Sequence, residues 1–324
     1  QAWSLRASPY IFPTSDATVF LTGTLPQTEE GIRSFIRGVI PALDQIGIRA
    51  EEVIKLAATA LVEEFVDGFW TKDELGIALA GRAAEKLSKE QLQSWQGPSP
   101  YADDQTLGES VIRFVLPVLS LKGLLCHAER RGGKAYLKLT EDWLGEELPR
   151  RDKQKESAEL LRRYMRCFGP SKVEHFSEWA GISPKQAGRI WKDVRDMYVE
   201  AGFEGRTGWL HHEDVPRLDM AKGSTGVRFL PPHDPYLHLR DRETIVSDKR
   251  FQRQIWKLQG NPGVLLVDGN VVGVWHPKKK GSLFEIKVEL FEEISSRNYS
   301  LIDAEAQSIA PFRGCSKAEV KVES

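Results

Sequence analysis

Two long segments of this 324-residue chain contain the same order of predicted elements. In the first, apolar residues recur at helical spacing over 51–65, and Thr71 with Glu74 forms a capping-box pattern at the start of a second helix. A third helix is expected over 108–125, where Pro117 predicts a break or kink. Two alternating runs around the sequence RGGK then predict a β-hairpin.

The second segment repeats this plan. Ser171 with Glu174 predicts the start of one helix as a capping box, and Ser183 before Pro184 predicts the start of the next. The helices are expected over 155–169, 171–182 and 183–194, and the hairpin over 197–212. Three helices followed by a two-stranded wing are typical of a winged helix-turn-helix domain.

From about residue 223 the apolar pattern changes to that of strands. Asp268-Gly269-Asn270 predicts a tight hairpin, 282–291 alternates as a half-buried strand, and 295–312 is expected to close the region as a helix. We therefore predict an α+β protein with tandem winged helix-turn-helix domains followed by a β-rich C-terminal domain. The expected parts are a partial N-terminal winged-helix region over 1–50, winged helices over 51–150 and 151–222, the β-rich domain over 223–316 and a tail over 317–324.

Charge and cysteine content narrow the function classes. The formal net charge is -1, from 45 Lys and Arg against 46 Asp and Glu, so any nucleic-acid surface must be local. The three cysteines have no C-x-x-C spacing, which predicts neither a disulfide framework nor a structural zinc site, and we expect no metal. P-loop, dinucleotide-binding and nucleophile-elbow motifs are absent from the sequence. No apolar run predicts a membrane span, which indicates a reduced, cytoplasmic compartment.

Basic residues gather where a winged helix would contact DNA. Lys185, Arg189 and Lys192 lie on one face of the predicted third helix of the second segment, and Arg195 lies close to them. The wing tips carry further cations, Arg130, Arg131, Lys134 and Arg206. Each group is either a phosphate-binding surface or an ordinary solvated face.

The stretch FLPPHDPYLHLRDR, residues 229–242, admits two interpretations. His233 and Asp234 could act as an acid/base pair, because His titrates near neutral pH. Adjacent residues of an extended segment point in opposite directions, however, and Asp before Pro235 commonly starts a turn. A structural turn and a functional site both remain open.

Five stretches carry a family resemblance when taken together in their order along the chain. They are WSLRASPYIFP, FGPSKVEHFSEWAGI, FLPPHDPYLHLRDR, GNPGVLLVDGNVVGVW and DAEAQSIAPF. The chain resembles the winged-helix DNA-binding family that includes the AlkZ and YcaQ bacterial DNA glycosylases.

The resemblance implies tandem winged helices and a β-rich domain arranged around a DNA channel. It implies removal of alkylated bases, and in some members crosslink unhooking, without a metal or organic cofactor. The expected partner is damaged double-stranded DNA, with no obligate protein partner, in the cytoplasm and on the nucleoid. Arg6, Tyr10, His233 and Asp234 would lie near the lesion, and Arg240 and Arg242 would contact phosphates.

The sequence departs from the family at its beginning. The family's Gln-x-Gln or Gln-x-Asp motif lies upstream of WSLRASPYIFP and cannot be mapped, and neither Gln1 nor Gln27 takes its place. The family's R-G-T-x-H pattern is here R-A-S-P-Y, with Tyr10 where His is usual. Either a preceding portion lies outside these residues or the chemistry is altered. The alternatives are a non-enzymatic DNA-binding protein, such as a transcriptional regulator, and a protein-interaction scaffold.

Overall fold

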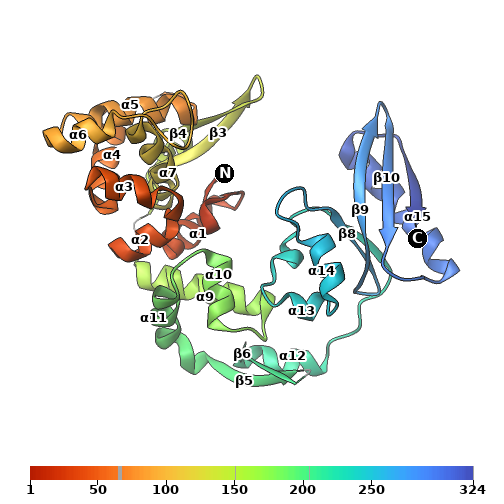
Figure 1. The fold of residues 1–324 in the computed structure, drawn as a ribbon. Coiled ribbons are helices and arrows are strands. Elements are labelled where there is room, and N and C mark those ends of the chain that lie inside the picture. The colour runs from red at the N-terminus through yellow and green to blue at the C-terminus, as the bar shows by residue number, and fades with distance from the viewer. Residues whose placement is uncertain (65–67, 150, 204, 324) are drawn as a thin grey trace. The chain divides into compact units, whose positions relative to one another are not determined.

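The computed structural model describes residues 1–64, 68–149, 151–203 and 205–323, and its contacts divide the chain into two units, Gln1–His212 and Glu213–Ser324 (Figure 1). The sequence placed its last major boundary at 222/223, whereas the contact division lies at 212/213. None of the helices in the described ranges is long and apolar enough to cross a membrane.

The first unit begins with short elements that the sequence analysis did not delimit. Strands β1 (Ala2–Trp3) and β2 (Pro9–Tyr10) pair around a 3-10 turn, η1 (Leu5–Ala7), and helices α1 (Ala17–Leu21), α2 (Glu29–Phe35) and α3 (Ile40–Ile46) follow. Apolar side chains of these elements, including Ile32 and Leu43, are buried in one core with residues up to Leu137. Most of residues 1–50 therefore share a core with the segment that follows them, whereas Leu5 and Val19 are buried in a second core with Leu160 and Phe176.

The first predicted repeat is present as helices and a hairpin. It contains α4 (Ala50–Glu64), α5 (Lys72–Ala84), α6 (Lys89–Trp95), α7 (Leu107–Leu121), β3 (Leu125–Arg131), β4 (Lys134–Leu139) and α8 (Thr140–Leu144). The capping box of Thr71 and Glu74 is confirmed at the start of α5. The break expected at Pro117 is not confirmed, because α7 continues through this residue. Burial of Leu116, Val118 and the residues around them favours an unbroken helix despite the hydrogen bond that proline cannot donate.

The second predicted repeat follows in the same order. It contains α9 (Lys153–Phe168), α10 (Val173–Ala180), α11 (Pro184–Val194), β5 (Tyr198–Phe203) and β6 (Arg206–His211). Ser183 caps α11 as expected, accepting a hydrogen bond from the Gln186 N–H at 3.2 Å. The capping box predicted for Ser171 and Glu174 is wrong. Ser171 instead shares a hydrogen bond of 2.8 Å with the Tyr164 hydroxyl, and its backbone pairs with Trp209, so its side chain is not available to α10.

The second unit is built on a five-stranded sheet in the order β11-β10-β9-β8-β7. Its elements are α12 (Val215–Asp219), β7 (Val227–Leu230), the 3-10 helix η7 (Pro235–His238), α13 (Arg242–Ile245), α14 (Lys249–Ile255), β8 (Gly263–Val267), β9 (Asn270–Lys280), β10 (Leu283–Leu290), α15 (Ser296–Ile309), the 3-10 helix η8 (Ala310–Arg313) and β11 (Lys317–Glu323). Residues 317–324 were predicted to form a tail. Residues 317–323 instead form β11, which pairs parallel with β10. Alternate side chains of β11, at Ala318, Val320 and Val322, pack against the core that includes α15.

An ion-pair cluster joins the start of the chain to α9. Arg162 and Arg163 both donate to Glu159, with Nε–O distances of 2.7 Å, and Arg163 also donates to Asp16 at 3.0 Å. Hydrogen bonding from Arg162, and then from Arg163, lowers the pKa of Glu159 from 4.5 to about 2. The hydrogen bonds of Arg162 and Arg163 to Glu159 therefore contribute fully to stability only while Glu159 is ionised.

We expect Glu159→Gln to lower the free energy of unfolding by about 1 kcal/mol at pH 7, after allowing for solvent screening. Because the folded pKa lies below the unfolded one, this contribution is complete above about pH 5 and is lost as the pH falls through 4.5 toward about 2. Urea unfolding of both proteins over pH 2–7 would measure it. Glu85→Gln, at an exposed helical pair with Arg82, is the control and should change little. A constant difference between Glu159→Gln and the wild type over this range would contradict the prediction.

Candidate functional site

Arg6 and Tyr10 lie together at the start of the first unit. Arg6 adopts a left-handed backbone with φ 54°, and Ala7 follows with φ 55°. The Arg6 guanidinium donates to the Tyr10 hydroxyl at 2.7 Å and to the Trp179 carbonyl. Because the tyrosine oxygen accepts from Arg6, its own O–H remains a donor for another group.

The turn between α10 and α11 provides the surface on which Arg6 packs. Gly181 ends α10 with φ 75°, and a Cβ there would lie 2.7 Å from the Arg6 Cα and 2.8 Å from its N. The sequence predicted neither Trp179 nor Gly181 as part of this arrangement. A glycine after a helix indicates a C-cap, but no local pattern reports a contact across 173 residues.

The basic face of α11 is exposed as expected. Lys185, Arg189 and Lys192 are all exposed, whereas Gln186, Ala187, Ile190 and Val194 are buried on the opposite side. Lys185 lies 3.3 Å from Glu30 in a pair whose side chains are 71% and 72% exposed, which contributes little stability.

Arg195 differs from these three residues. It is half-buried, its guanidinium carbon lies 3.7 Å from the centre of the Trp209 ring, and it donates to the Tyr198 carbonyl at 3.1 Å. Stacking on Trp209 therefore gives Arg195 a role in joining α11 to the β5–β6 hairpin. Arg206, the first residue of β6, is half-buried after Gly205 at the turn of the same hairpin.

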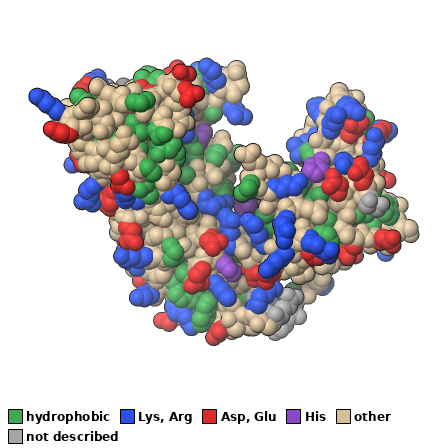
Figure 2. Space-filling model, in the orientation of Figure 1, with side chains coloured by type: hydrophobic (Ala, Val, Ile, Leu, Met, Phe, Trp, Pro, Cys, Tyr) green, Lys and Arg blue, Asp and Glu red, His purple; other side chains and the backbone are tan. Residues whose placement is uncertain are grey.

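Three cations of the β3–β4 hairpin lie at its turn, and Figure 2 shows Lys and Arg side chains on the surface in this part of the first unit. Arg130, Arg131 and Lys134 are exposed there around the two glycines of the turn, Gly132 and Gly133. Arg131 has a fixed direction, because its guanidinium carbon lies 4.0 Å from the centre of the Phe69 ring and its Nε donates to Glu129 at 2.9 Å. Sequence spacing did not reveal Phe69 as a partner of the hairpin.

The stretch that contains His233 and Asp234 belongs to the second unit and is held at both ends. The indole N–H of Trp275 donates to the Leu230 carbonyl at 2.9 Å, and that of Trp256 donates to the Leu237 carbonyl at 3.1 Å. Asp234 accepts a hydrogen bond from the Tyr236 N–H at 2.9 Å and caps η7. The predicted turn is confirmed, and one carboxylate oxygen of Asp234 takes part in it.

His233 and the two arginines of this stretch are placed as follows. His233 is exposed, with φ 66°. Arg242 lies over the Trp256 ring at 4.9 Å. The Nε atom of Arg240 is buried and has no hydrogen-bond partner among the residues that the structure describes. Arg242 thus stacks on the same indole that holds the Leu237 carbonyl.

Comparison with known proteins identifies the relationship. A model of the AlkZ-like DNA glycosylases matches residues 1–312. The chain belongs to the AlkZ-like DNA glycosylase family. The interstrand DNA cross-link repair glycosylase of Streptomyces sahachiroi is 24% identical over 332 residues, which cover 99% of this chain and 81% of that protein. The solved structure of Streptomyces sahachiroi DNA glycosylase AlkZ matches with a TM-score of 0.72 and 21% identity, and covers 99% of this chain and 81% of that one.

The resemblance stated from the sequence is therefore confirmed for this AlkZ-like protein. Its mixed α/β fold, with a β-sheet in the C-terminal region, agrees with the AlkZ structure. Membership places the chain among DNA glycosylases, which are DNA-repair proteins.

The backbone conformation at Ala7 gives a reason for the glycine in the family's R-G-T-x-H pattern. Ala7 stands where that pattern has glycine and has φ 55°, a conformation that glycine adopts without strain. This AlkZ-like chain therefore carries backbone strain next to Arg6, which has φ 54°. At the last position of the pattern, Tyr10 presents a hydroxyl in place of an imidazole.

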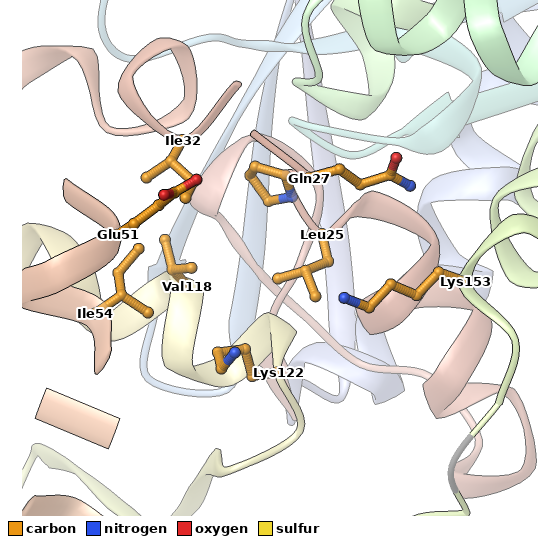
Figure 3. A pocket seen from close by; sticks show the side chains of 9 residues that line it. Leu25, Gln27, Ile32, Glu51, Ile54, Val118, Lys122 and Lys153 are labelled. Atoms are coloured by element: carbon orange, nitrogen blue, oxygen red, sulfur yellow. The ribbon is translucent and has the colours of Figure 1, made fainter. Parts of the chain in front are cut away.

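A separate pocket of about 380 Å³ lies in the first unit, between α2, α4 and α7 (Figure 3). Leu25, Ile32, Ile54 and Val118 form its apolar lining, and Gln27, Glu51, Lys122 and Lys153 lie around them. The lining residues include none that the sequence predicted for the reaction. Within the described ranges, no group of three or more His, Cys, Asp or Glu side chains could hold a metal ion.

Proposed function

We propose that this AlkZ-like protein is a DNA glycosylase that hydrolyses the N-glycosidic bond of alkylated bases in duplex DNA. The observation that carries the proposal is the contact of the Arg6–Tyr10 pair with the α10–α11 turn. A pair suited to polar catalysis is thereby attached to the helix with the exposed basic face. The relative named an interstrand DNA cross-link repair glycosylase supports cross-linked DNA as a further substrate.

We propose that the two helix-and-hairpin segments act as tandem winged helices on DNA. A third helix that presents Lys185, Arg189 and Lys192 suits a groove of duplex DNA, and the hairpin tips suit its phosphates. The proposed contacts are Lys185, Arg189, Lys192, Arg195, Arg130, Arg131, Lys134, Arg206, Arg240 and Arg242. Such a protein would work on the chromosome, in the cytoplasm and on the nucleoid.

The proposed chemistry requires water and two kinds of polar group. An alkylated base carries positive charge, which weakens its bond to the sugar, so the protein has to stabilise an oxocarbenium-like sugar and place a water molecule. The Asp234 carboxylate suits the first task, because it is negative and fixed by its turn. Within the same unit, His233 suits the second, as an exposed hydrogen-bonding group toward the water or the leaving base.

Asp234→Asn tests the carboxylate without removing the turn, because an amide oxygen still accepts from the Tyr236 N–H. We expect this variant to release an N7-alkylguanine from duplex DNA at least about tenfold more slowly than the wild type. Single-turnover base release from the full chain would measure the rate, with a protein-free reaction to subtract spontaneous loss.

Asp248→Asn is the matched control, since Asp248 caps α14 in the same way by accepting from the Arg250 N–H at 2.7 Å. This control should release the base at the wild-type rate. Equal rates for Asp234→Asn and the wild type would remove Asp234 from the reaction. No release by the wild type, together with salt-sensitive binding to undamaged duplex, would favour a non-enzymatic DNA-binding protein.

A further inference from the structure

Gly188 lies in the interior of α11, where glycine is unfavourable. Glycine destabilises a helix interior relative to alanine, because more backbone entropy is lost on folding. Packing explains such a cost at some other glycines, although Gly81 in α5, like Gly188, has open space around it. A Cβ at Gly108 would lie 2.2 Å from the Trp95 ring, and one at Gly208 would lie 3.0 Å from Pro170. A Cβ at Gly188 would meet nothing within 4 Å, so the fold does not require glycine there.

The exposed face of α11 has Gly188 at its centre. Lys185 lies three residues before it and Lys192 four residues after it, so both flank Gly188 on the same helical face. Arg189 is the next residue, also exposed. The basic face therefore has a gap without a side chain between its cations.

A groove of about 410 Å³ begins at this gap. Gly188 lines it together with Trp191 and Lys192 of α11 and Trp209 of β6. Lys172, Glu174, Glu200 and Thr207 are also part of the lining. The carboxylates of Glu174 and Glu200 repel phosphate. A phosphate-bearing strand in this region is therefore more stable beside the lysines of α11 than beside these two residues.

We propose that Gly188 is a close-approach point at which the sugar-phosphate backbone of duplex DNA lies against α11. The inference rests on the proposed function, because it assumes that α11 binds DNA. Without a side chain at position 188, a strand can reach the helix backbone while Lys185 and Lys192 contact phosphates on either side. A side chain there would hold the strand away from both lysines.

The test compares Gly188→Ala and Gly188→Leu with the same changes at Gly81. Gly81 lies in the interior of α5, is exposed and likewise has nothing within 4 Å of an added Cβ. Both alanine variants should raise the melting temperature by about 1–3 °C, because alanine favours a helix. The readout is the Kd of the full chain for an undamaged DNA duplex over a range of salt concentrations.

We expect Gly188→Leu to weaken DNA binding at least about tenfold and to make the salt dependence shallower by about two phosphate contacts, whereas Lys192→Gln should remove about one. Gly188→Ala should weaken binding by a smaller factor although it raises the melting temperature. The Gly81 variants should bind as the wild type does.

Each other outcome decides against the proposal. Wild-type binding by Gly188→Leu would overturn the close approach and leave the proposed function standing. A melting temperature for Gly188→Leu below that of the wild type would show that the protein itself excludes the side chain. Absence of salt-sensitive DNA binding by the wild type would overturn the DNA-binding role of α11, and this inference with it.

Discussion

Gly181→Ala is expected to lower the free energy of unfolding by about 2–4 kcal/mol. Part of this is the strain of a non-glycine residue in the left-handed region, roughly 1–2 kcal/mol, since Gly181 has φ 75°. The rest comes from overpacking, because the new Cβ would lie within 3 Å of two backbone atoms of Arg6. A backbone cannot move aside as the end of a flexible side chain can. The turn before α11 and the Arg6–Tyr10 pair should therefore be displaced together.

Gly47→Ala separates the two contributions. Gly47 ends α3 with φ 71° and has nothing within 4 Å of an added Cβ, so only the strain should appear, at about 1–2 kcal/mol. Urea unfolding of both variants and the wild type would measure the difference. Equal losses in the two variants would contradict the contact between Gly181 and Arg6.

Trp275→Ala is expected to destabilise the second unit by about 3–5 kcal/mol. Trp275 is 1% exposed, packs against Phe229 with ring centres 5.3 Å apart, and donates its indole N–H to the Leu230 carbonyl. Alanine would leave a cavity and remove the donor that the carbonyl uses. Gly263, directly opposite in the sheet, leaves room for the indole, since a Cβ there would lie 2.2 Å from it.

Hydrogen exchange of the full chain would locate this effect. Amides of β8, β9 and β10 should lose protection in Trp275→Ala, whereas those of α7 in the first unit should keep it. Trp143→Ala is the control, because Trp143 is 43% exposed and its removal should cost little. Unchanged protection of the sheet in Trp275→Ala would refute the role assigned to this side chain.

The sequence predicted elements well where local chemistry is sufficient. The Thr71–Glu74 box, the Ser183 cap and the Asp268-Gly269-Asn270 hairpin each depend on neighbouring residues, and the structure contains all three. Ser171 does not cap α10, because its side chain shares a hydrogen bond with Tyr164 of α9 and its backbone pairs with Trp209 of β6. The strand at 317–323 was missed although charged and apolar residues alternate along it, because its pairing partner, β10, is distant in sequence.

The same limit applies to the candidate site. Exposure of Lys185, Arg189 and Lys192 followed from helical periodicity, because their opposite face is apolar. Stacking of Arg195 on Trp209 could not be predicted from this periodicity, since it depends on how the β5–β6 hairpin packs against α11. The position of Arg6 against Gly181 and Trp179 likewise depends on tertiary structure.

The segment from Leu230 to Leu237 has a consequence for the kinetics of binding. Both of its ends are tied to indole N–H groups, and Asp234 closes the turn between them. Its backbone is thus ordered before any ligand arrives, and a ligand that binds there loses little affinity to loop ordering. A lid would require an opening step and would limit the association rate. This segment should instead act as a rigid surface, so that the rate of association at His233 and Asp234 is governed by diffusion and orientation.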